Sequence, residues 1–473
     1  MLVPRRCNYL RRLVLLSRSN FPPEHPRVDG GRTVRLRIVV SLVATTLLAF
    51  SSLSWAEENR AAWRTPDGNG VFESKNLPET WSETQGILWK TPIPAWGAST
   101  PAVWGDAIFL TSHVEPVEED AEGPFDLVAL RIDRNTGRIV WQKKLGEADI
   151  PRTGARGRSK YHRYHNAASP SPTTDGRYVV FHFGNGDLVV TDFDGNTVWR
   201  RNLQDDYAPY SIWWGHANSP IIVGDLLISI CIQDSLADLQ EKPNPSYIVA
   251  HELATGRERW FTLRMTGAEK EWCDAYTTPI VRRVDGRTEI IVMGGTWLDA
   301  YDAQSGKQLW YLPGLEGNRT ITGPVVVGDV VFATIGKGGP TFAARIGGEG
   351  RLPRDRILWE NKSNCPDSPT PVYYRGLLFL VSDNGIAQCL DAATGEIKWR
   401  ERIGGTFKAS PIVADGKVYF VNLEGECTVT AADAEYREIA KNELDDAFTA
   451  SPVCTDGRLY LRGKRFLYCI GKP

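Results

Sequence analysis

The sequence predicts an all-β chain that folds as an eight-bladed β-propeller, with the ring closed by a strand from near the N-terminus. Three observations lead to this prediction. A small residue followed by Pro begins eight apolar runs, tight-turn dipeptides separate alternating strands, and an element that joins an acidic residue, a Thr-Gly turn and a Trp recurs along the chain. Repeats of this kind are typical of folds built from one supersecondary unit.

The pairs of a small residue with Pro, which we call marker pairs, set the number of repeats. They are Thr100-Pro101, Ser169-Pro170, Ser219-Pro220, Thr278-Pro279, Gly323-Pro324, Thr370-Pro371, Ser410-Pro411 and Ser451-Pro452. The last two spacings between the prolines are 40 and 41 residues. This is the length of four short strands with their turns, which is the usual size of a propeller blade.

A turn dipeptide and an alternating strand follow many of the marker pairs. Asp415-Gly416 precedes the alternating residues 417–421, and Asp285-Gly286 and Asp456-Gly457 lie at comparable places. Gly readily adopts the positive φ that tight hairpins require. Each marker strand is therefore expected to pair with the strand that follows it.

Most repeats end in an acidic residue, a Thr-Gly or Ser-Gly turn, and a Trp on the fourth strand. The clearest copies are residues 133–141, 252–260, 302–310 and 391–399. A single sheet cannot bury both faces alone, so we expect each Trp to fill the wedge between neighbouring blades, with the turn as a partner for its indole N–H. These structural Trp residues are Trp89, Trp141, Trp199, Trp260, Trp310, Trp359 and Trp399.

The last repeat ends at residues 467–470, one strand short of a full blade. Residues 87–89 have the sequence of an outer strand and are expected to complete this blade, which leaves no open sheet edge at the closure. The propeller is therefore assigned to residues 85–473, and residues 57–84 to an N-terminal extension.

Residues 1–56 are predicted to be a signal peptide with an extended n-region. They contain nine Arg and only two acidic residues, and their apolar run at 38–50 is short for a membrane span. Ser54 and Ala56 provide the small residues for cleavage after Ala56. An uncleaved membrane anchor is the alternative. We expect export to the periplasm or the extracellular space, with no transmembrane span after cleavage.

Charge and cysteine spacing exclude several classes of protein. Residues 57–473 contain 46 basic and 55 acidic residues, a net charge of −9 that disfavours nucleic acid as a partner. No C-x-x-C motif occurs, which argues against the usual zinc clusters and an attached c-type haem, and we predict no metal site. The seven cysteines of the mature chain fall largely in predicted strands and are expected to be mostly buried free thiols. We expect a monomer.

The element at residues 391–399 (DAATGEIKW) resembles the tryptophan-docking repeat of pyrroloquinoline-quinone-like (PQQ-like) β-propellers, and the resemblance covers roughly residues 85–473. That family includes quinoprotein alcohol dehydrogenases, which bind the quinone and calcium. It also includes the cofactor-free scaffold lipoprotein of the outer-membrane barrel-assembly machinery. The dehydrogenases carry an adjacent Cys pair over the quinone, whereas this chain has no Cys-Cys. The resemblance therefore favours the cofactor-free members.

The loops that lead into the innermost strands, which we call leading loops, are expected to gather on one face around the central channel. Long loops on a rigid scaffold are where function concentrates. In this chain the leading loops are rich in aromatic and charged residues. The candidate ligand-binding residues are His165, Trp214, His216, Asp274, Arg319 and Lys408, and no catalytic residue is assigned. The alternative is that these side chains satisfy one another and cap the channel.

These observations predict a secreted, non-catalytic PQQ-like propeller that binds a protein, a glycan or a small ligand at the leading-loop face without a cofactor. The alternative is an oxidoreductase, an alcohol or sugar dehydrogenase that uses pyrroloquinoline quinone with calcium.

Overall fold

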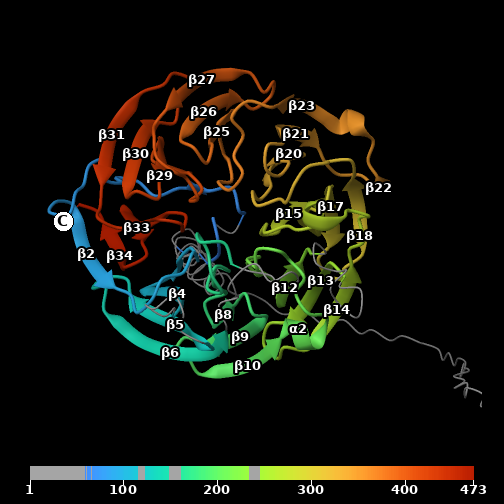
Figure 1. The fold of residues 1–473 in the computed structure, drawn as a ribbon, viewed down its shortest axis with the longest axis horizontal. Helices are drawn as coiled ribbons and strands as arrows, with labels where there is room; N and C mark the ends of the chain where they lie inside the picture. The colour runs from blue at the N-terminus through green and yellow to red at the C-terminus, as the bar shows by residue number, and fades with distance from the viewer. Residues whose placement is uncertain are drawn as a thin grey trace, which may run out of the picture. The chain divides into compact units, whose positions relative to one another are not determined.

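Each repeat folds as a four-stranded antiparallel sheet, and the eight sheets surround a common axis as the blades of a propeller in this computed structural model (Figure 1). The structure describes residues 59, 61–64, 67–114, 123–148, 161–233 and 245–472. The eight sheets confirm the predicted fold class. The predicted signal peptide, residues 1–56, lies outside the described residues.

The blades follow one another in chain order, and each has an innermost strand at the axis and an outermost strand at the rim. From inside to outside, blade one is β3 (Ala102–Trp104), β4 (Ala107–His113), β5 (Phe125–Asp133) and β6 (Ile139–Ala148). Blade two is β7 (Thr173–Thr174), β8 (Tyr178–His182), β9 (Asp187–Asp192) and β10 (Thr197–Asn202). Blade three is β11 (Ile221–Val223), β12 (Leu226–Cys231), β13 (Tyr247–Glu252) and β14 (Glu258–Leu263). Blade four is β15 (Ile280–Val284), β16 (Arg287–Gly294), β17 (Trp297–Asp302) and β18 (Gln308–Leu312), with β22 (Gly350–Arg351) added outside.

The second half of the ring repeats the pattern. Blade five is β19 (Val325–Val327), β20 (Val330–Thr334), β21 (Thr341–Arg345) and β23 (Ile357–Asn361). Blade six is β24 (Val372–Tyr374), β25 (Leu377–Val381), β26 (Ile386–Asp391) and β27 (Ile397–Arg402). Blade seven is β28 (Ile412–Ala414), β29 (Lys417–Val421), β30 (Glu426–Ala431) and β31 (Glu438–Glu443). Blade eight is β32 (Val453–Thr455), β33 (Arg458–Arg462), β34 (Phe466–Ile470) and β2 (Ile87–Pro92). The described helices are short: α2 (Leu203–Asp206), η2 (Lys270–Trp272) and η3 (Arg354–Arg356).

The ring closes as predicted, because β2 is antiparallel to β34 with Ile87 opposite Ile470 and Trp89 opposite Cys469. The tight turns also have the predicted backbone. Asp415 and Gly416 have φ values of 52° and 72°, so both residues of this turn are left-handed, as a type I′ hairpin requires.

The docking Trp residues connect each blade to the next. The indole N–H of Trp359 donates to the carbonyl oxygen of Ala392 at 3.0 Å, and that of Trp141 donates to Phe193 at 2.9 Å. In both cases the acceptor follows the acidic residue of the next blade's turn. The same bond joins Trp89 to Arg134, Trp199 to Leu253 and Trp260 to Ala303. Trp399 donates instead to the carbonyl oxygen of an acidic residue itself, Asp433.

Trp310 differs from the other six because blade five lacks the Thr-Gly turn. Its indole N–H instead donates to the carboxylate of Glu289 on its own blade, at 3.4 Å. Trp310 is nevertheless fully buried. The packing role of the Trp is thus kept where its usual acceptor is missing.

Hydrogen bonds join marker pairs of neighbouring blades around part of the channel. The backbone N–H of Thr370 donates to Ser410 Oγ at 3.0 Å, and that of Ser410 donates to Ser451 Oγ at 3.1 Å. In blade two the structure differs from the prediction, because Ser171-Pro172 rather than Ser169-Pro170 occupies the marker position. Ser171 Oγ accepts from the N–H of Thr100 at 2.9 Å, and β7 begins two residues later.

The N-terminal extension is built into the propeller, which the sequence did not indicate. β1 (Val71–Phe72) runs parallel to β28 and widens the sheet of blade seven. Arg64 is buried, and its guanidinium donates to the carbonyl oxygens of Thr370, Pro371 and Pro411 at 2.7–3.1 Å. Burial lowers the pKa of Arg64 to about 9. This residue therefore ties the extension to blades six and seven.

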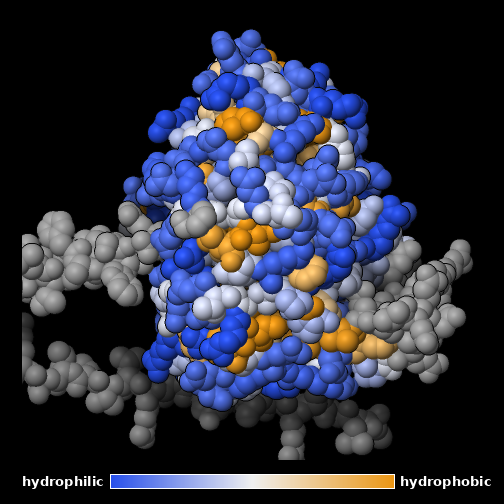
Figure 2. All heavy atoms as spheres, turned by 90° about the vertical axis from the view of Figure 1, so that its left-hand side faces the viewer, coloured by the Kyte–Doolittle hydropathy of each residue, from blue (hydrophilic) through white to orange (hydrophobic). Residues whose placement is uncertain are grey.

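The side of the ring shown in Figure 2 is mostly hydrophilic. Residues of β6 alternate between more and less exposed, and the side wall that carries β2 and β31 is mostly hydrophilic, with small separated apolar spots (Figure 2). Within the described parts of the chain, no helix has the length and hydropathy needed to cross a membrane.

Candidate functional site

A cavity of about 480 Å³ lies at the hub of the leading-loop face, and we call it the funnel. Its wall takes residues from the leading segment of every blade and from the loops that join second to third strands in blades five and six. The lining residues are Ala98, His162, Arg163, Tyr164, His165, Ser169, Trp214, Ala217, Tyr276, Arg319, Ile321, Lys337, Asp367, Ser368, Asp383, Lys408 and Thr449. The loops therefore gather around the axis, as the sequence predicts.

Four of the six candidate residues line the funnel, namely His165, Trp214, Arg319 and Lys408. The structure differs from the sequence-based expectation for the other two, because His216 and Asp274 are fully buried and lie behind the wall. His216 Nε2 lies 3.1 Å from the carbonyl oxygen of Ile230, and its ring stacks on Tyr210. The carboxylate of Asp274 accepts from the backbone N–H of Trp213 at 2.9 Å. Both side chains thus bond to backbone groups behind the wall and do not line the funnel.

Lys408 is held by an acidic loop of blade six. Its ammonium donates to Asp383 Oδ1 at 2.6 Å and to Ser368 Oγ at 3.1 Å. It also lies 5.3 Å from the centre of the Tyr164 ring, within the range of a cation–π contact. Because Asp383 also accepts from the backbone N–H of Asp367, the ammonium is fixed in one place.

Arg319 forms the second charged group of the wall. Its guanidinium donates to Asp367 Oδ2 at 3.2 Å and to Glu271 Oε1 at 3.5 Å. Glu271 Oε1 also accepts from the indole N–H of Trp214 at 3.0 Å. Glu271 therefore links the aromatic side of the funnel to its cationic side.

The pKa values of the two carboxyl groups in this wall, Asp367 and Asp383, are shifted in opposite directions. Burial raises the pKa of Asp367 above its ordinary value, and Arg319 only partly opposes the rise. Burial acts in the same direction on Asp383, but the Lys408 ammonium and the hydrogen bonds of Ser368 and Asp367 together lower its pKa. Asp367 Oδ1 is buried and makes no hydrogen bond among the described residues. That oxygen is an acceptor which the protein itself leaves unused.

Aromatic rings form the opposite side of the funnel. The rings of His162 and Trp214 meet edge to face at 5.1 Å, and His162 also contacts Tyr164 at 5.0 Å. His165 packs between Tyr161 and Tyr276, and its burial lowers the pKa to about 4. His165 is therefore neutral at pH 7. The funnel thus combines aromatic faces with paired charges, a mixture that suits a polar ligand.

Sequence reasoning missed the acidic half of this wall. Asp367 lies in a leading loop, three residues before the marker pair Thr370-Pro371. Asp383 lies in the turn between β25 and β26, which the topology brings to the same face. The position of each residue in its repeat could have identified it. A residue just before a marker pair, or in the turn between the second and third strands of a blade, lies on the leading-loop face.

Residues 78–236 and 351–469, more than half of the chain, match the protein family described as outer membrane protein assembly factor BamB. The chain belongs to this family of PQQ-like repeat propellers. The family resemblance seen in the docking element is thereby confirmed. No curated protein sequence matches the chain.

Solved propellers with different activities share this fold. BamB from Moraxella catarrhalis has a TM-score of 0.55 and 14% identity, covering 82% of this chain and 97% of that chain. The quinohemoprotein alcohol dehydrogenase from Comamonas testosteroni has a TM-score of 0.62 and 12% identity, covering 90% and 82%. A europium-containing methanol dehydrogenase has a TM-score of 0.64 and 10% identity, covering 89% and 100%. At such identities the likeness shows the fold alone.

The dehydrogenase relatives raise the question of whether the residues present suit a quinone with calcium. Calcium takes six to eight oxygen ligands, usually with several carboxylates. Among the described residues, no group of three or more His, Cys, Asp or Glu side chains is arranged to hold a metal ion. In the funnel, Asp367 and Asp383 are both engaged by cationic side chains. The described side chains of the funnel therefore do not fit a calcium ion bound together with a quinone.

Proposed function

We propose that this family member is a non-catalytic binding module that takes a polar ligand, a segment of a protein or a glycan, into the funnel. The observation that carries the proposal is the construction of the funnel, in which every blade contributes to one cavity of about 480 Å³. A cavity of this size can enclose a small ligand or the tip of a larger one.

The charges of the funnel support binding over turnover. Lys408 is held beside Asp383 and Arg319 beside Asp367, so these cations act as fixed hydrogen-bond donors. Trp214 and Tyr164 add aromatic contact area at little entropic cost. A ligand with hydroxyl or amide groups can accept hydrogen bonds from these cations.

The predicted signal peptide supports placing the protein outside the cytoplasm. We propose export to the periplasm or the extracellular space, where a polymer or an envelope protein is available as a ligand. Fusion of residues 1–60 to a reporter that is active only after export tests this proposal. Retention of the reporter in the cytoplasm would contradict it.

Binding at the funnel is tested with the mature protein and two defined probe sets. We would titrate neutral oligosaccharides and short uncharged peptides by calorimetry, comparing the wild type with Trp214→Ala and Lys408→Met. Trp272→Ala is the matched control, because Trp272 is exposed and does not line the funnel. We expect at least one probe set to bind, both funnel variants to weaken it about tenfold or more, and the control to leave it unchanged.

The quinone alternative is tested in the same preparation. Titration with pyrroloquinoline quinone and Ca²⁺ is followed by absorbance and by dye reduction with alcohols and sugars. Stoichiometric quinone binding with substrate-dependent dye reduction would replace the binding-module proposal. Failure of every probe in both sets would also overturn it.

A further inference from the structure

A second cavity lies on the other side of the marker ring, beneath the funnel. Along the chain, funnel residues such as Ala217 come before the marker pair, whereas Ile221 and Ile280 of the second cavity come after it. All inner strands run in the same direction, so the two cavities are on opposite sides of the ring. The lower cavity measures about 130 Å³, well above the roughly 10–15 Å³ that one water molecule needs.

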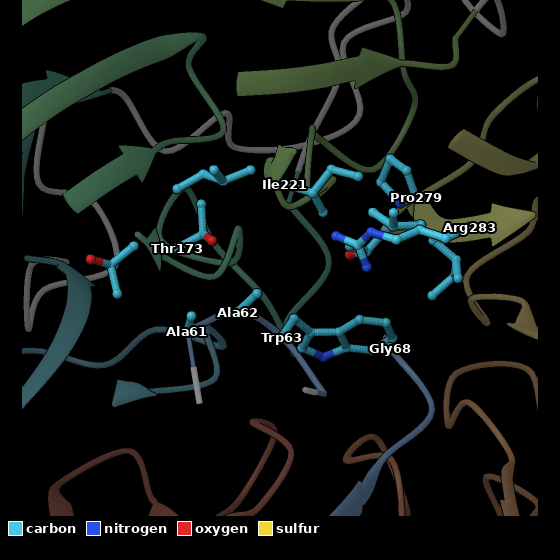
Figure 3. Close-up of a pocket in the computed structure, with 13 residues that line it drawn as sticks. Ala61, Ala62, Trp63, Gly68, Thr173, Ile221, Pro279 and Arg283 are labelled. Carbon is cyan, nitrogen blue, oxygen red and sulfur yellow. The ribbon is translucent and has the colours of Figure 1, made fainter. Parts of the chain in front are cut away.

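The walls of the lower cavity come from three blades and the N-terminal extension (Figure 3). β7, β11 and β15 supply one side, and Ala61, Ala62, Trp63 and Gly68 supply the other. Two contacts fix the extension at this place. The N–H of Thr174 donates to the carbonyl oxygen of Ala61 at 2.9 Å, and Gly68 sits so close to Ile280 that an added Cβ would lie 2.1 Å from its Cδ1.

One charged side chain faces this cavity among the described lining residues. In Figure 3 the Arg283 guanidinium extends from β15 over the cavity, between Ile221 and the Trp63 ring. Arg283 has no ion pair or hydrogen bond in the described part of the chain, whereas its neighbour Arg282 is paired with Glu289 at 3.1 Å. No carboxylate belongs to the described lining of the cavity. An exposed, unpaired guanidinium at a pocket mouth favours an anion.

The rest of the lining narrows the class of anion. The hydroxyls of Thr173 and Thr278 lie in the wall and make no hydrogen bond among the described residues, so they are available to an oxyanion. The remaining side chains are mostly apolar, including Ala62, Ile221 and Ile280. A guanidinium matches a planar carboxylate with two parallel hydrogen bonds. A tetrahedral, fully hydrated anion such as sulfate gains nothing from the apolar walls.

We propose that the lower cavity binds a carboxylate that carries a short aliphatic group, with Arg283 holding the carboxylate and the walls of β11, β15 and the extension enclosing the aliphatic part. Two sources have this chemistry, a free short-chain acid and the C-terminus of a peptide that ends in a small residue. The site is separate from the funnel, so it does not depend on the proposed function of the funnel.

The test uses calorimetric titration of the mature protein with four probes. Propionate represents the free acid, N-acetyl-alanine the peptide terminus, propionamide a neutral molecule of the same shape, and sulfate a small anion without an apolar part. We expect propionate or N-acetyl-alanine to bind and propionamide and sulfate to bind at least about tenfold more weakly, because a charge-assisted bond or the apolar contact is lost. The tighter of the two carboxylates identifies the source.

Three variants locate the site. Arg283→Gln should weaken carboxylate binding about tenfold or more, and because Arg283 is exposed this variant is expected to fold. Gly68→Ala should also weaken binding, since the new methyl group pushes the extension away from Ile280. Arg345→Gln is the matched control, an exposed arginine of β21 far along the chain from the cavity, and should leave binding unchanged.

Several results would overturn the proposal. They are the absence of carboxylate binding, equal binding of propionamide, equal or tighter binding of sulfate, and wild-type affinity in Arg283→Gln. Loss of binding in Arg345→Gln would have the same effect, because it would show a general response to surface charge.

Discussion

Replacement of Gly395 by Ala tests how tightly the Trp-docking turn fits the Trp of the preceding blade. Gly395 has φ +74°, and an added Cβ would lie 2.6 Å from Cδ2 and 2.7 Å from Cε3 of Trp359. A left-handed non-glycine residue costs about 1–2 kcal/mol. Overpacking against the indole adds about 1–3 kcal/mol, because the ring must shift away from the carbonyl of Ala392 that holds its N–H. We therefore expect Gly395→Ala to lower the free energy of unfolding by about 2–5 kcal/mol.

Gly416→Ala separates the cost of the left-handed backbone from the cost of overpacking against the indole. Gly416 has φ +72°, yet no atom lies within 4 Å of its added Cβ. This control should lose only the backbone term of about 1–2 kcal/mol. Urea denaturation followed by circular dichroism compares the midpoints of the two variants with the wild type. If Gly395→Ala is no less stable than Gly416→Ala, the turn does not clamp the indole and our account of blade docking is wrong.

Burial underlies three further predictions. Trp399→Ala should cost about 3–5 kcal/mol through the cavity it leaves, with funnel binding preserved in the folded protein; an unchanged melting temperature would contradict the wedge role. Burial lowers the pKa of His216 to about 4, against about 6.5 when unfolded, so the unfolded chain binds the proton more readily and stability should fall by up to about 3 kcal/mol from pH 6.5 to pH 4. His216→Gln should flatten this dependence in urea titrations, and an unaltered slope would count against it. Burial raises the pKa values of Cys389 and Cys469 to about 12, so a thiol reagent at pH 8 should label them only after denaturation; labelling of the native protein would show that these strands open.

The repeated features of the fold could be predicted from the sequence because each copy has the same local structural requirement. A docking turn needs Gly next to an indole, as Gly395 lies next to Trp359, and a tight hairpin needs two left-handed residues, as at Asp415-Gly416. The N-terminal extension was not readable in this way. Arg64 binds carbonyl groups of residues more than 300 positions away, and no local pattern reports such a contact.

The structure brings four of the six predicted candidate residues to one cavity and buries the other two. His165, Trp214, Arg319 and Lys408 reach the funnel because they lie a few residues before the marker strands. His216 and Asp274 lie in the same segments, but their side chains turn inward: His216 lies against the carbonyl oxygen of Ile230 in β12, and Asp274 accepts from the N–H of Trp213 in a leading loop. Residue type and spacing do not decide between these two directions, since the same polar atoms can serve a ligand or the backbone.

Closure of the ring by β2 has a consequence for how the protein is made. Trp89 is paired with Cys469, 380 residues later. The ladder between β2 and β34 therefore cannot form until the C-terminal strand has been synthesised. Until then β2 has no partner among the described strands, and a strand edge left unpaired in this way can pair with other chains. A product that stops short of Phe466 keeps this edge unpaired. The sheet of blade eight is therefore complete only in a chain that reaches Ile470.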